Sequence, residues 1–214
     1  MDHHRAIILA NGDPVAGPID LPGDAVVIAA DGGLALAAPL GLRVHTVIGD
    51  MDSVSPEDLE QARRSGARVD THPTEKSITD LGLALDAAIA DGAEEIVVVG
   101  GSGGRLDHLL ANAALLASDR YAAVALRWLT GAETVTVCRL GRPAEVEGET
   151  GDLVSLIPVG GPVQGITTSG LRWPLNDGGL APGSTRGISN EMTETEATVA
   201  VEDGSLLVVH GGKG

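Results

Sequence analysis

The first 130 residues alternate short, continuous apolar runs with segments that carry helix signals. The apolar runs cover residues 5–10, 25–30, 44–48, 67–71, 95–99 and 121–129, and the helical segments cover residues 31–38, 55–65, 77–90 and 106–117. Strands that are apolar along their whole length are typical of a parallel sheet with helices on both faces. The alternation therefore predicts an N-terminal doubly wound α/β domain.

Polar and glycine residues gather where these runs end. They are Asn11-Gly12, Asp31-Gly32-Gly33, Gly49-Asp50, His72 and the segment 100–107. Parallel sheets bind ligands at the carboxyl ends of their strands, near the point where the strand order reverses. The pattern thus predicts a binding site at one edge of the sheet.

Two aspartates, Asp50 and Asp52, follow the apolar run 44–48 directly. In an extended chain, residues i and i+2 point the same way, so both carboxylates can converge on one point. Hard anionic oxygens suit a divalent cation such as Mg²⁺ that carries phosphates. An ordinary acidic turn is the alternative, because Asp and Gly both favour turns.

The segment GGSGGRLDHLLAN, residues 100–112, is a glycine-rich loop that leads from a strand into a helix. Its N–H groups and the helix N-terminus can cradle phosphate, while Arg105 could pair with phosphate and Asp107 could join the metal ligands. It matches neither a Walker A loop nor a dinucleotide-binding loop. A flexible turn in which Asp107 caps the helix remains open.

The segment THPTEKSITD, residues 71–80, places Thr79 and Asp80 in the first turn of a helix. Asp80 is either a further metal ligand or an acid stabilised by the helix dipole. Lys76, one of only two lysines with Lys213, is a candidate phosphate contact.

The charge balance narrows the possible partners. A formal net charge of −16 argues against sequence-independent nucleic-acid binding, which needs basic surface. The single cysteine, Cys138, fits a reducing compartment. No apolar run is long enough to cross a bilayer, and the N-terminus does not resemble a signal peptide. We therefore expect a soluble cytoplasmic protein with no membrane partner.

After about residue 130 the helical periodicity disappears. Short β-rich runs occur at residues 134–139, 152–157, 163–169, 185–189, 197–201 and 205–209, between Gly, Pro and Asp turns. Such punctuation is typical of a small antiparallel sandwich or barrel. We expect an α/β domain at residues 1–130 and a β domain at residues 131–214.

The second domain holds Trp173, one of three aromatic residues in the chain. On its own it is a candidate core anchor. The segment GISNE, residues 187–191, offers Ser189 and Asn190 as hydrogen-bonding groups at a strand end, or forms a simple turn.

Taken in order, these motifs resemble the thiamine pyrophosphokinase family. The matching pieces are ILANG (8–12), ADGG (30–33), IGDMDS (48–53), EKSITD (75–80), GGSGGRLDHLLAN (100–112), GLRWPL (170–175) and ISNE (188–191). They span nearly the whole chain. The resemblance implies an α/β ATP-binding domain, a C-terminal β-sandwich that binds thiamine, a homodimer, and Mg²⁺-dependent transfer of the pyrophosphoryl group of ATP to the thiamine hydroxyl with release of AMP.

The resemblance also implies roles for individual residues. Asp50, Asp52 and Asp80 would hold the metal and act in catalysis with Arg105 and Asp107. The nucleotide would contact Asp31, Gly32, Lys76, Thr79, Gly103, Gly104, Arg105 and Asn112. Thiamine would contact Trp173, which suits a flat cationic ligand, together with Ser189 and Asn190.

Two positions depart from the family pattern, which often has acids where this chain has Ser77 and Gly82. Two alternative functions follow from the same residues. One is a diphosphokinase of the same fold that acts on another hydroxymethyl acceptor, such as a pterin. The other is a non-catalytic thiamine sensor, although a pure binder would not need so many metal-directed acids.

Overall fold

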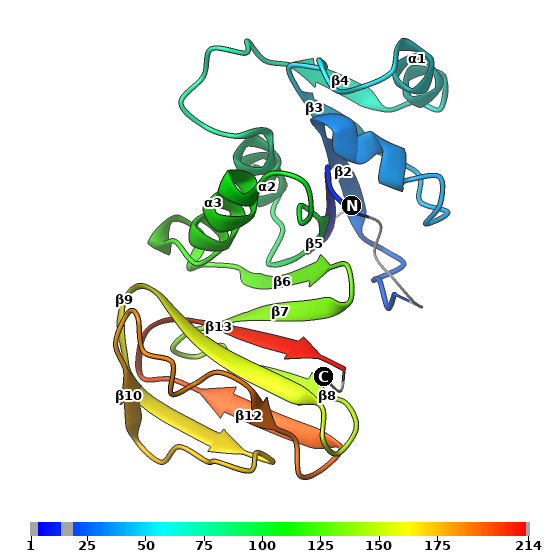
Figure 1. Ribbon diagram of the computed structural model, residues 1–214. Helices are drawn as coiled ribbons and strands as arrows, with labels where there is room; N and C mark the ends of the chain where they lie inside the picture. Colours follow the sequence, from blue (N-terminus) through cyan, green and yellow to red (C-terminus); the bar gives the residue numbers. More distant parts are fainter. Residues whose placement is uncertain (1–3, 14–18, 213–214) are drawn as a thin grey trace. The chain divides into compact units, whose positions relative to one another are not determined.

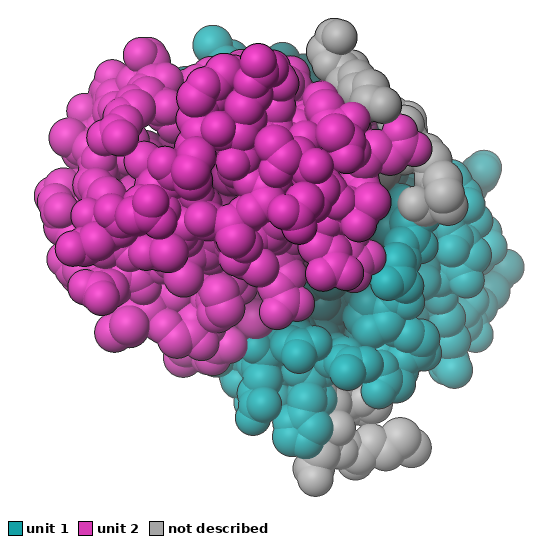
Figure 2. Space-filling model, turned by 90° about the horizontal axis from the view of Figure 1, so that it is seen from below, with its two compact units in different colours: residues 1–112, 128–131 teal, residues 113–127, 132–214 magenta. Residues whose placement is uncertain are grey.

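The computed structural model describes residues 4–13 and 19–212, which excludes Lys213. The chain divides into two compact units, coloured separately in Figure 2. The first unit comprises residues 1–112 and 128–131, and the second comprises residues 113–127 and 132–214. Both α3 (Leu106–Leu116) and β6 (Ala125–Thr130) cross this division.

The first unit is built on parallel strands. They are β1 (Arg5–Ala10), β2 (Val26–Ala30), β3 (Thr46–Gly49), β4 (Arg68–Thr71) and β5 (Glu95–Gly100), in the spatial order β4-β3-β2-β1-β5. All pairs among them are parallel. The chain passes outward from β1 to β4 and then returns to the other side of β1 with β5. The expected alternation of strands and helices is confirmed, and the strand order reverses beside β1.

Helices join these strands, and Figure 1 shows α2 (Asp80–Ala90) on one side of them and the 3-10 helix η1 (Asp31–Leu36) on the other. The helix α1 (Pro56–Arg64) starts as its sequence predicts. The hydroxyl of Ser55 accepts a hydrogen bond from the N–H of Asp58, and Pro56 occupies the first turn. The expected start of the next helix at residue 77 is wrong, because Thr79 caps α2 and the helix begins at Asp80.

The apolar residues of α3 are only partly buried. Leu116 is fully buried, but Leu106 and Leu110 are 67% and 61% exposed. Helical periodicity correctly gave a helix here, yet it could not show which end of its apolar stripe is covered.

The second unit consists of antiparallel strand pairs. The strands are β7 (Glu133–Cys138), β8 (Ala144–Glu147), β9 (Leu153–Ser169), β10 (Gly178–Leu180), β11 (Asn190–Glu191), β12 (Glu196–Ala200) and β13 (Asp203–Gly211), in the order β7-β13-β9-β12-β8 with β10 and β11 also on β9. Its short 3-10 helix η2 (Asp119–Tyr121) holds Tyr121, which we expected in a strand.

The strand β9 is the longest element of the chain. The runs expected at residues 152–157 and 163–169 are one strand, which pairs with β13 through its first half and with β12 through its end. Gly160, at a φ of 81°, lies between the two halves and allows the chain to change partner. The strand expected at residues 185–189 is wrong, since this segment forms turns before β11.

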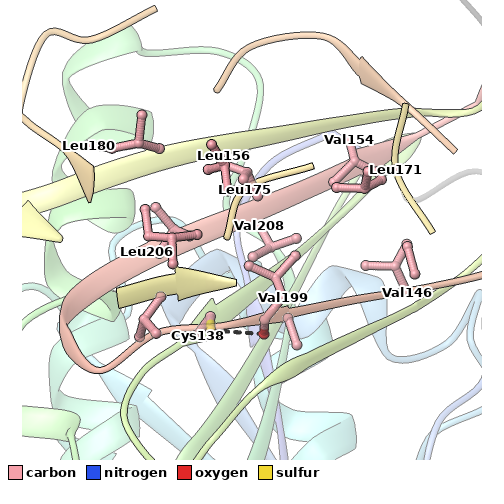
Figure 3. Packing of buried hydrophobic residues seen from close by; sticks show 14 of the residues in the cluster. Cys138, Val146, Val154, Leu156, Leu171, Leu175, Leu180, Val199, Leu206 and Val208 are labelled. Atoms are coloured by element: carbon pink, nitrogen blue, oxygen red, sulfur yellow. Dashed lines mark hydrogen bonds between the residues drawn. The ribbon is translucent and has the colours of Figure 1, made fainter. Parts of the chain in front are cut away.

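Aliphatic side chains fill the core of the second unit, as Figure 3 shows. Val154, Leu156, Leu206 and Val208 are at most 1% exposed. The thiol of Cys138 lies among them and donates to the carbonyl of Val199 at 3.2 Å, and burial raises its pKa. The single cysteine is therefore a core residue.

Replacing Leu156 by alanine should remove about 2–5 kcal/mol from the free energy of unfolding of this unit, because the lost methyl groups leave a cavity. Ile157, the next residue, is 37% exposed, so Ile157→Ala is the matched control and should cost less. Urea titration followed by circular dichroism compares the two. Equal losses would contradict the burial pattern of β9.

Within the described residues, no helix combines the length and the apolar character needed to cross a membrane.

Candidate active site

The strand register aligns the carboxyl ends of the parallel strands. At this edge Ala10 pairs with both Ala30 and Gly100, Ala30 pairs with Ile48, and Gly49 pairs with Thr71. The residues that follow these ends are Asn11, Asp31, Asp50, His72 and Gly101. The polar residues that the sequence places after separate strands therefore belong to one edge, beside the point where the strand order reverses.

Three carboxylates meet at this edge. Asp31, Asp50 and Asp52 each have a carboxylate oxygen within 4.8 Å of the others. Asp31 is 9% exposed, and its buried Oδ1 accepts no hydrogen bond from the described residues. A buried oxygen without a donor requires an explanation, and a bound cation is a suitable partner. This donor set of hard oxygens fits Mg²⁺.

The turn after β3 directs two of these carboxylates. We expected Asp50 and Asp52 to converge because the chain is extended, but Met51 adopts a φ of 65°, so this reason is wrong. The N–H of Asp52 instead bonds back to Asp50 Oδ1 at 3.3 Å, which closes a tight turn. Gly49 has a φ of 147°, and a Cβ there would lie 2.9 Å from Asp80 Oδ1. Only glycine allows this approach.

Lys76 links this group to Asp80. Its Nζ donates to Asp50 Oδ2 at 3.3 Å and lies 3.1 Å from Asp80 Oδ1. The second contact is an ion pair. The Lys76 side chain is only 13% exposed. Asp50 therefore belongs to the cluster of three carboxylates and also binds the Lys76 ammonium.

The pKa values in this cluster follow from burial and pairing. Burial raises the pKa of Asp50, but the Asp52 amide and the Lys76 ammonium outweigh it, so this pKa is below its ordinary value. Burial lowers the pKa of Lys76, but attraction to Asp80 and Asp50 leaves it raised. For Asp80, burial is the largest effect, and its pKa stays raised despite Lys76.

Two side chains fix the glycine-rich loop after β5 by hydrogen bonds to its backbone carbonyls. Trp128 Nε1 donates to the carbonyl of Gly100 at 2.6 Å, and Asn112 Nδ2 donates to the carbonyl of Gly101 at 2.9 Å. A Cβ on Gly103 would overlap the carboxylate of Asp13, whereas Gly104 faces open space. Asn112, expected as a nucleotide contact, thus supports the loop.

Arg105 and Asp107 contact each other rather than the acidic cluster. The guanidinium makes two hydrogen bonds to the carboxylate, at 3.1 Å and 2.5 Å, and both side chains are exposed. The Arg105 bond is the largest effect on the pKa of Asp107, which is lowered, and the same bond raises the pKa of Arg105. Asp107 is not part of the three-carboxylate group.

The remaining expected residues of this unit have local structural contacts. Thr79 Oγ1 accepts a hydrogen bond from the N–H of Gly82 as the cap of α2. Gly32 gives Asn11 and Ser53 room, since a Cβ there would lie 2.9 Å from Asn11 Nδ2. Gly82 is buried, and a Cβ there would lie 2.6 Å from Ile78 Cγ1. An acid at position 82 would therefore displace Ile78, whereas Ser77 is exposed.

The second unit brings the three expected thiamine contacts into one neighbourhood. Trp173 is 55% exposed, whereas Asn190 is 7% exposed. Asn190 Oδ1 accepts from the N–H of Trp173 at 3.1 Å, and its Nδ2 donates to the Trp173 carbonyl at 2.8 Å. Ser189 adopts a φ of 56° and donates its N–H to Ser155 Oγ. Trp173 is not the core anchor that its sequence context alone allowed.

Two residues beside Trp173 were missed from the sequence. The guanidinium carbon of Arg172 lies 5.1 Å from the centre of the indole, and its Nη1 donates to Glu191 Oε2 at 2.7 Å. The only signals were the adjacency of Arg172 to a scarce tryptophan and the acid that ends the ISNE motif.

Comparison with known proteins covers both units. Residues 21–126 match a family model described as the catalytic domain of thiamin pyrophosphokinase, and residues 143–206 match one described as its vitamin B1 binding domain. Thiamine pyrophosphokinase of Bacillus subtilis is 28% identical over 182 residues, which is 85% of each chain. Thiamine pyrophosphokinase 1 of Oryza sativa is 30% identical over 74% of this chain but only 62% of its own length.

Solved structures agree with these matches. The crystal structure of the Bacillus subtilis enzyme superposes with a TM-score of 0.82 at 26% identity and covers 98% of this chain and 99% of that one. The Geobacillus thermodenitrificans thiamin pyrophosphokinase gives a TM-score of 0.78 at 28% identity, covering 98% of both chains.

The mixed α/β fold is shared with solved thiamine pyrophosphokinases, which are transferases of the kinase type. Both matching family models carry one family description and together span most of the chain. The chain belongs to the thiamine pyrophosphokinase family. The pterin-directed and sensor alternatives are not favoured, since the matches name thiamine pyrophosphokinases.

Proposed function

We propose that this chain transfers the pyrophosphoryl group of ATP to the hydroxyl of thiamine, and that the cluster of Asp31, Asp50, Asp52, Lys76 and Asp80 is where the phosphates are held. The observation that carries the proposal is the convergence of three carboxylate oxygens within 4.8 Å, with Lys76 bound to one of the three residues. The family relationship supplies the two substrates.

In this proposal the thiamine hydroxyl attacks the β-phosphorus of ATP. The new bond joins that oxygen to the β-phosphorus, the bond from the β-phosphorus to the oxygen bridging to the α-phosphorus breaks, and AMP leaves with that oxygen. The hydroxyl proton passes to a carboxylate of the cluster. Such transfers depend on positioning and charge neutralisation more than on covalent chemistry of the protein.

The chain's own residues divide this work. Asp31, Asp50, Asp52 and Asp80 would hold Mg²⁺, which when bound offsets negative charge on the phosphates. Lys76 and Arg105 would contact phosphate oxygens, and the glycine-rich loop with Gly103 and Gly104 offers backbone N–H groups. Arg105 must exchange Asp107 for phosphate, which is feasible because the pair is exposed.

The organisation of the chain follows the same proposal. We assign residues 1–130 to a doubly wound ATP-binding domain and residues 131–214 to a β-sandwich that binds thiamine at Trp173. We also propose a cytoplasmic homodimer, in which an interface would cover the exposed Leu106 and Leu110.

The decisive test measures AMP release by purified protein from ATP and Mg²⁺, with and without thiamine. We expect AMP and thiamine diphosphate in equal amounts, and AMP formation only when thiamine is present. A hydroxymethyl pterin offered instead of thiamine should give none. Binding of thiamine without AMP would favour the sensor, and AMP formed only with the pterin would favour the other acceptor.

A further inference from the structure

Trp173 projects from a segment that is fixed at both ends. The flanking Leu171 and Leu175 are 5% and 7% exposed, so both side chains are in the core of the second unit. Leu175 exchanges two hydrogen bonds with Thr168, one with its hydroxyl and one with its N–H. Between these anchors the indole remains 55% exposed. An exposed aromatic ring on a rigid segment is suited to stacking against a flat ligand.

Asn190 fixes the backbone at the tryptophan itself. One side-chain amide binds both the N–H and the carbonyl of Trp173, and its Oδ1 also accepts the N–H of Glu191 at 2.9 Å. A carbonyl oxygen has two lone pairs, so Oδ1 has no acceptor capacity left for a ligand. With 7% exposure, Asn190 is placed to hold Trp173, and only the second N–H of its Nδ2 is uncommitted.

A cationic side chain lies over one face of the Trp173 ring. The guanidinium of Arg172 lies over the indole at 5.1 Å, and Glu191 holds it by the side-chain bond of 2.7 Å while a second bond joins the Arg172 N–H to the Glu191 carbonyl. A guanidinium on one face weakens the attraction of the ring for a second cation on the other. The carboxylate of Glu191 offsets this charge.

We propose that Asn190 and Glu191 are positioning residues which make Trp173 a one-faced stacking platform for the cationic ring system of thiamine. This inference rests on the proposed function and deepens it. Asn190 sets the direction of the indole, and Glu191 keeps Arg172 on the closed face and neutralises its charge. Neither residue touches the ligand in this arrangement.

The composition of the chain allows a direct test. There are only two tryptophans, and Trp128 is 3% exposed in the other unit, so 5-fluorotryptophan labelling should give two separate fluorine resonances. We expect added thiamine to shift the Trp173 resonance and leave the Trp128 resonance in place. A Trp173 resonance that saturating thiamine does not move would overturn the platform, whereas the proposed activity would stand if thiamine-dependent AMP release persisted.

Asn190→Ala tests the positioning role. We expect the dissociation constant of thiamine to rise about tenfold or more, with a matching rise in KM, because the platform loses its orientation. ATP binding and kcat at saturating thiamine should change little, and the free Trp173 resonance should move and sharpen. Asn176→Ala, which changes an exposed asparagine directly after this segment, is the matched control and should behave as the parent chain.

Two outcomes contradict the role of Asn190. Unchanged thiamine affinity in Asn190→Ala would mean that thiamine binding does not depend on the hydrogen bonds that hold Trp173 in place. Lost affinity with an unchanged Trp173 resonance would mean that Asn190 touches the ligand directly. If Asn190→Ala does not fold, Asn190→Ser retains a hydroxyl that can accept one backbone N–H and adds no charge, and it should show a smaller change of the same kind.

Glu191→Gln tests the charge argument. The substitution preserves hydrogen bonding but leaves the Arg172 charge without compensation, so thiamine should bind about threefold to tenfold more weakly. An analogue whose thiazolium is replaced by an uncharged ring should bind equally well to both proteins. Equal losses for the charged and the neutral ligand would overturn the electrostatic role of Glu191.

Discussion

Asp50→Asn should reduce thiamine-dependent AMP release by about a thousandfold or more, since a carboxylate that holds a catalytic cation stabilises charge in the transition state by several kcal/mol. Asp50 is the residue at which the structure concentrates its interactions. It belongs to the three-carboxylate group, binds Lys76, and closes the turn with the N–H of Asp52. Asparagine keeps the shape of the side chain and can still accept the hydrogen bond from the N–H of Asp52. It removes the negative charge that attracts Mg²⁺ and the Lys76 ammonium.

The measurement pairs turnover with calorimetric titration of Mg²⁺. We expect Asp50→Asn to lose most of its Mg²⁺ affinity while its circular dichroism stays unchanged. Asp91→Asn is the control, because Asp91 is an exposed residue at the end of α2, outside the cluster. If Asp50→Asn turned over thiamine at the parental rate with its fold intact, the assignment of the cluster to catalysis would be wrong.

The fold of the first unit could be predicted well because its signals are local. Each apolar run is short and continuous and ends in glycine or a polar residue, and β1 is found at the residues expected. Alternation of strands and helices then implies parallel pairing. The fold of the second unit is harder to predict, because its strand order depends on pairing between residues far apart in the sequence. The single strand β9 was read as two, since Gly160 and the residues after it look like a turn in the sequence but form a bend within a strand.

The candidate site could be predicted as a set of residues at one edge, but not as a network of partners. Parallel pairing places Asp31 and Asp50 at the same edge from sequence alone. Nothing local indicates that Lys76 binds Asp50, 26 positions away. Side-chain partners depend on rotamers and on strand register, which motif spacing does not specify.

The hydrogen-bond partners of Asn190 could not be predicted from the sequence for the same reason. The ISNE motif correctly drew attention to a polar residue near Trp173, and its implied role was a ligand contact. The structure instead commits its oxygen to two backbone N–H groups. An asparagine that binds the backbone and an asparagine that binds a ligand look the same in a sequence. Only the hydrogen bonds of the structure distinguish them.

Lys76→Met should weaken ATP binding and at the same time strengthen Mg²⁺ binding in the absence of nucleotide. Nζ now neutralises Asp50 and Asp80 from 3.3 Å and 3.1 Å, so an incoming cation meets a positive charge already in place. Burial and pairing leave the pKa of Asp50 below its ordinary 3.8 and that of Lys76 above its ordinary 10.5, which keeps the pair charged throughout the neutral range. Because the pKa of Asp50 is lowered, the stability it gains from pairing is lost only as the pH falls through that lowered value.

The size of the effect follows from the same contacts. Without the ammonium, Asp50 and Asp80 repel each other, so the metal-free protein should lose unfolding free energy. Mg²⁺ should then bind about tenfold more tightly and raise the melting temperature more than in the parent chain, while kcat/KM for ATP falls about a hundredfold. Calorimetric titration with Mg²⁺ and with ATP separates the two effects, and Lys76→Arg, which retains the charge, should show neither gain in metal affinity nor extra metal stabilisation. If Lys76→Met bound Mg²⁺ no more tightly than the parent chain, the ammonium would not compete with Mg²⁺. Asp50 would then bind the ammonium and Mg²⁺ at the same time.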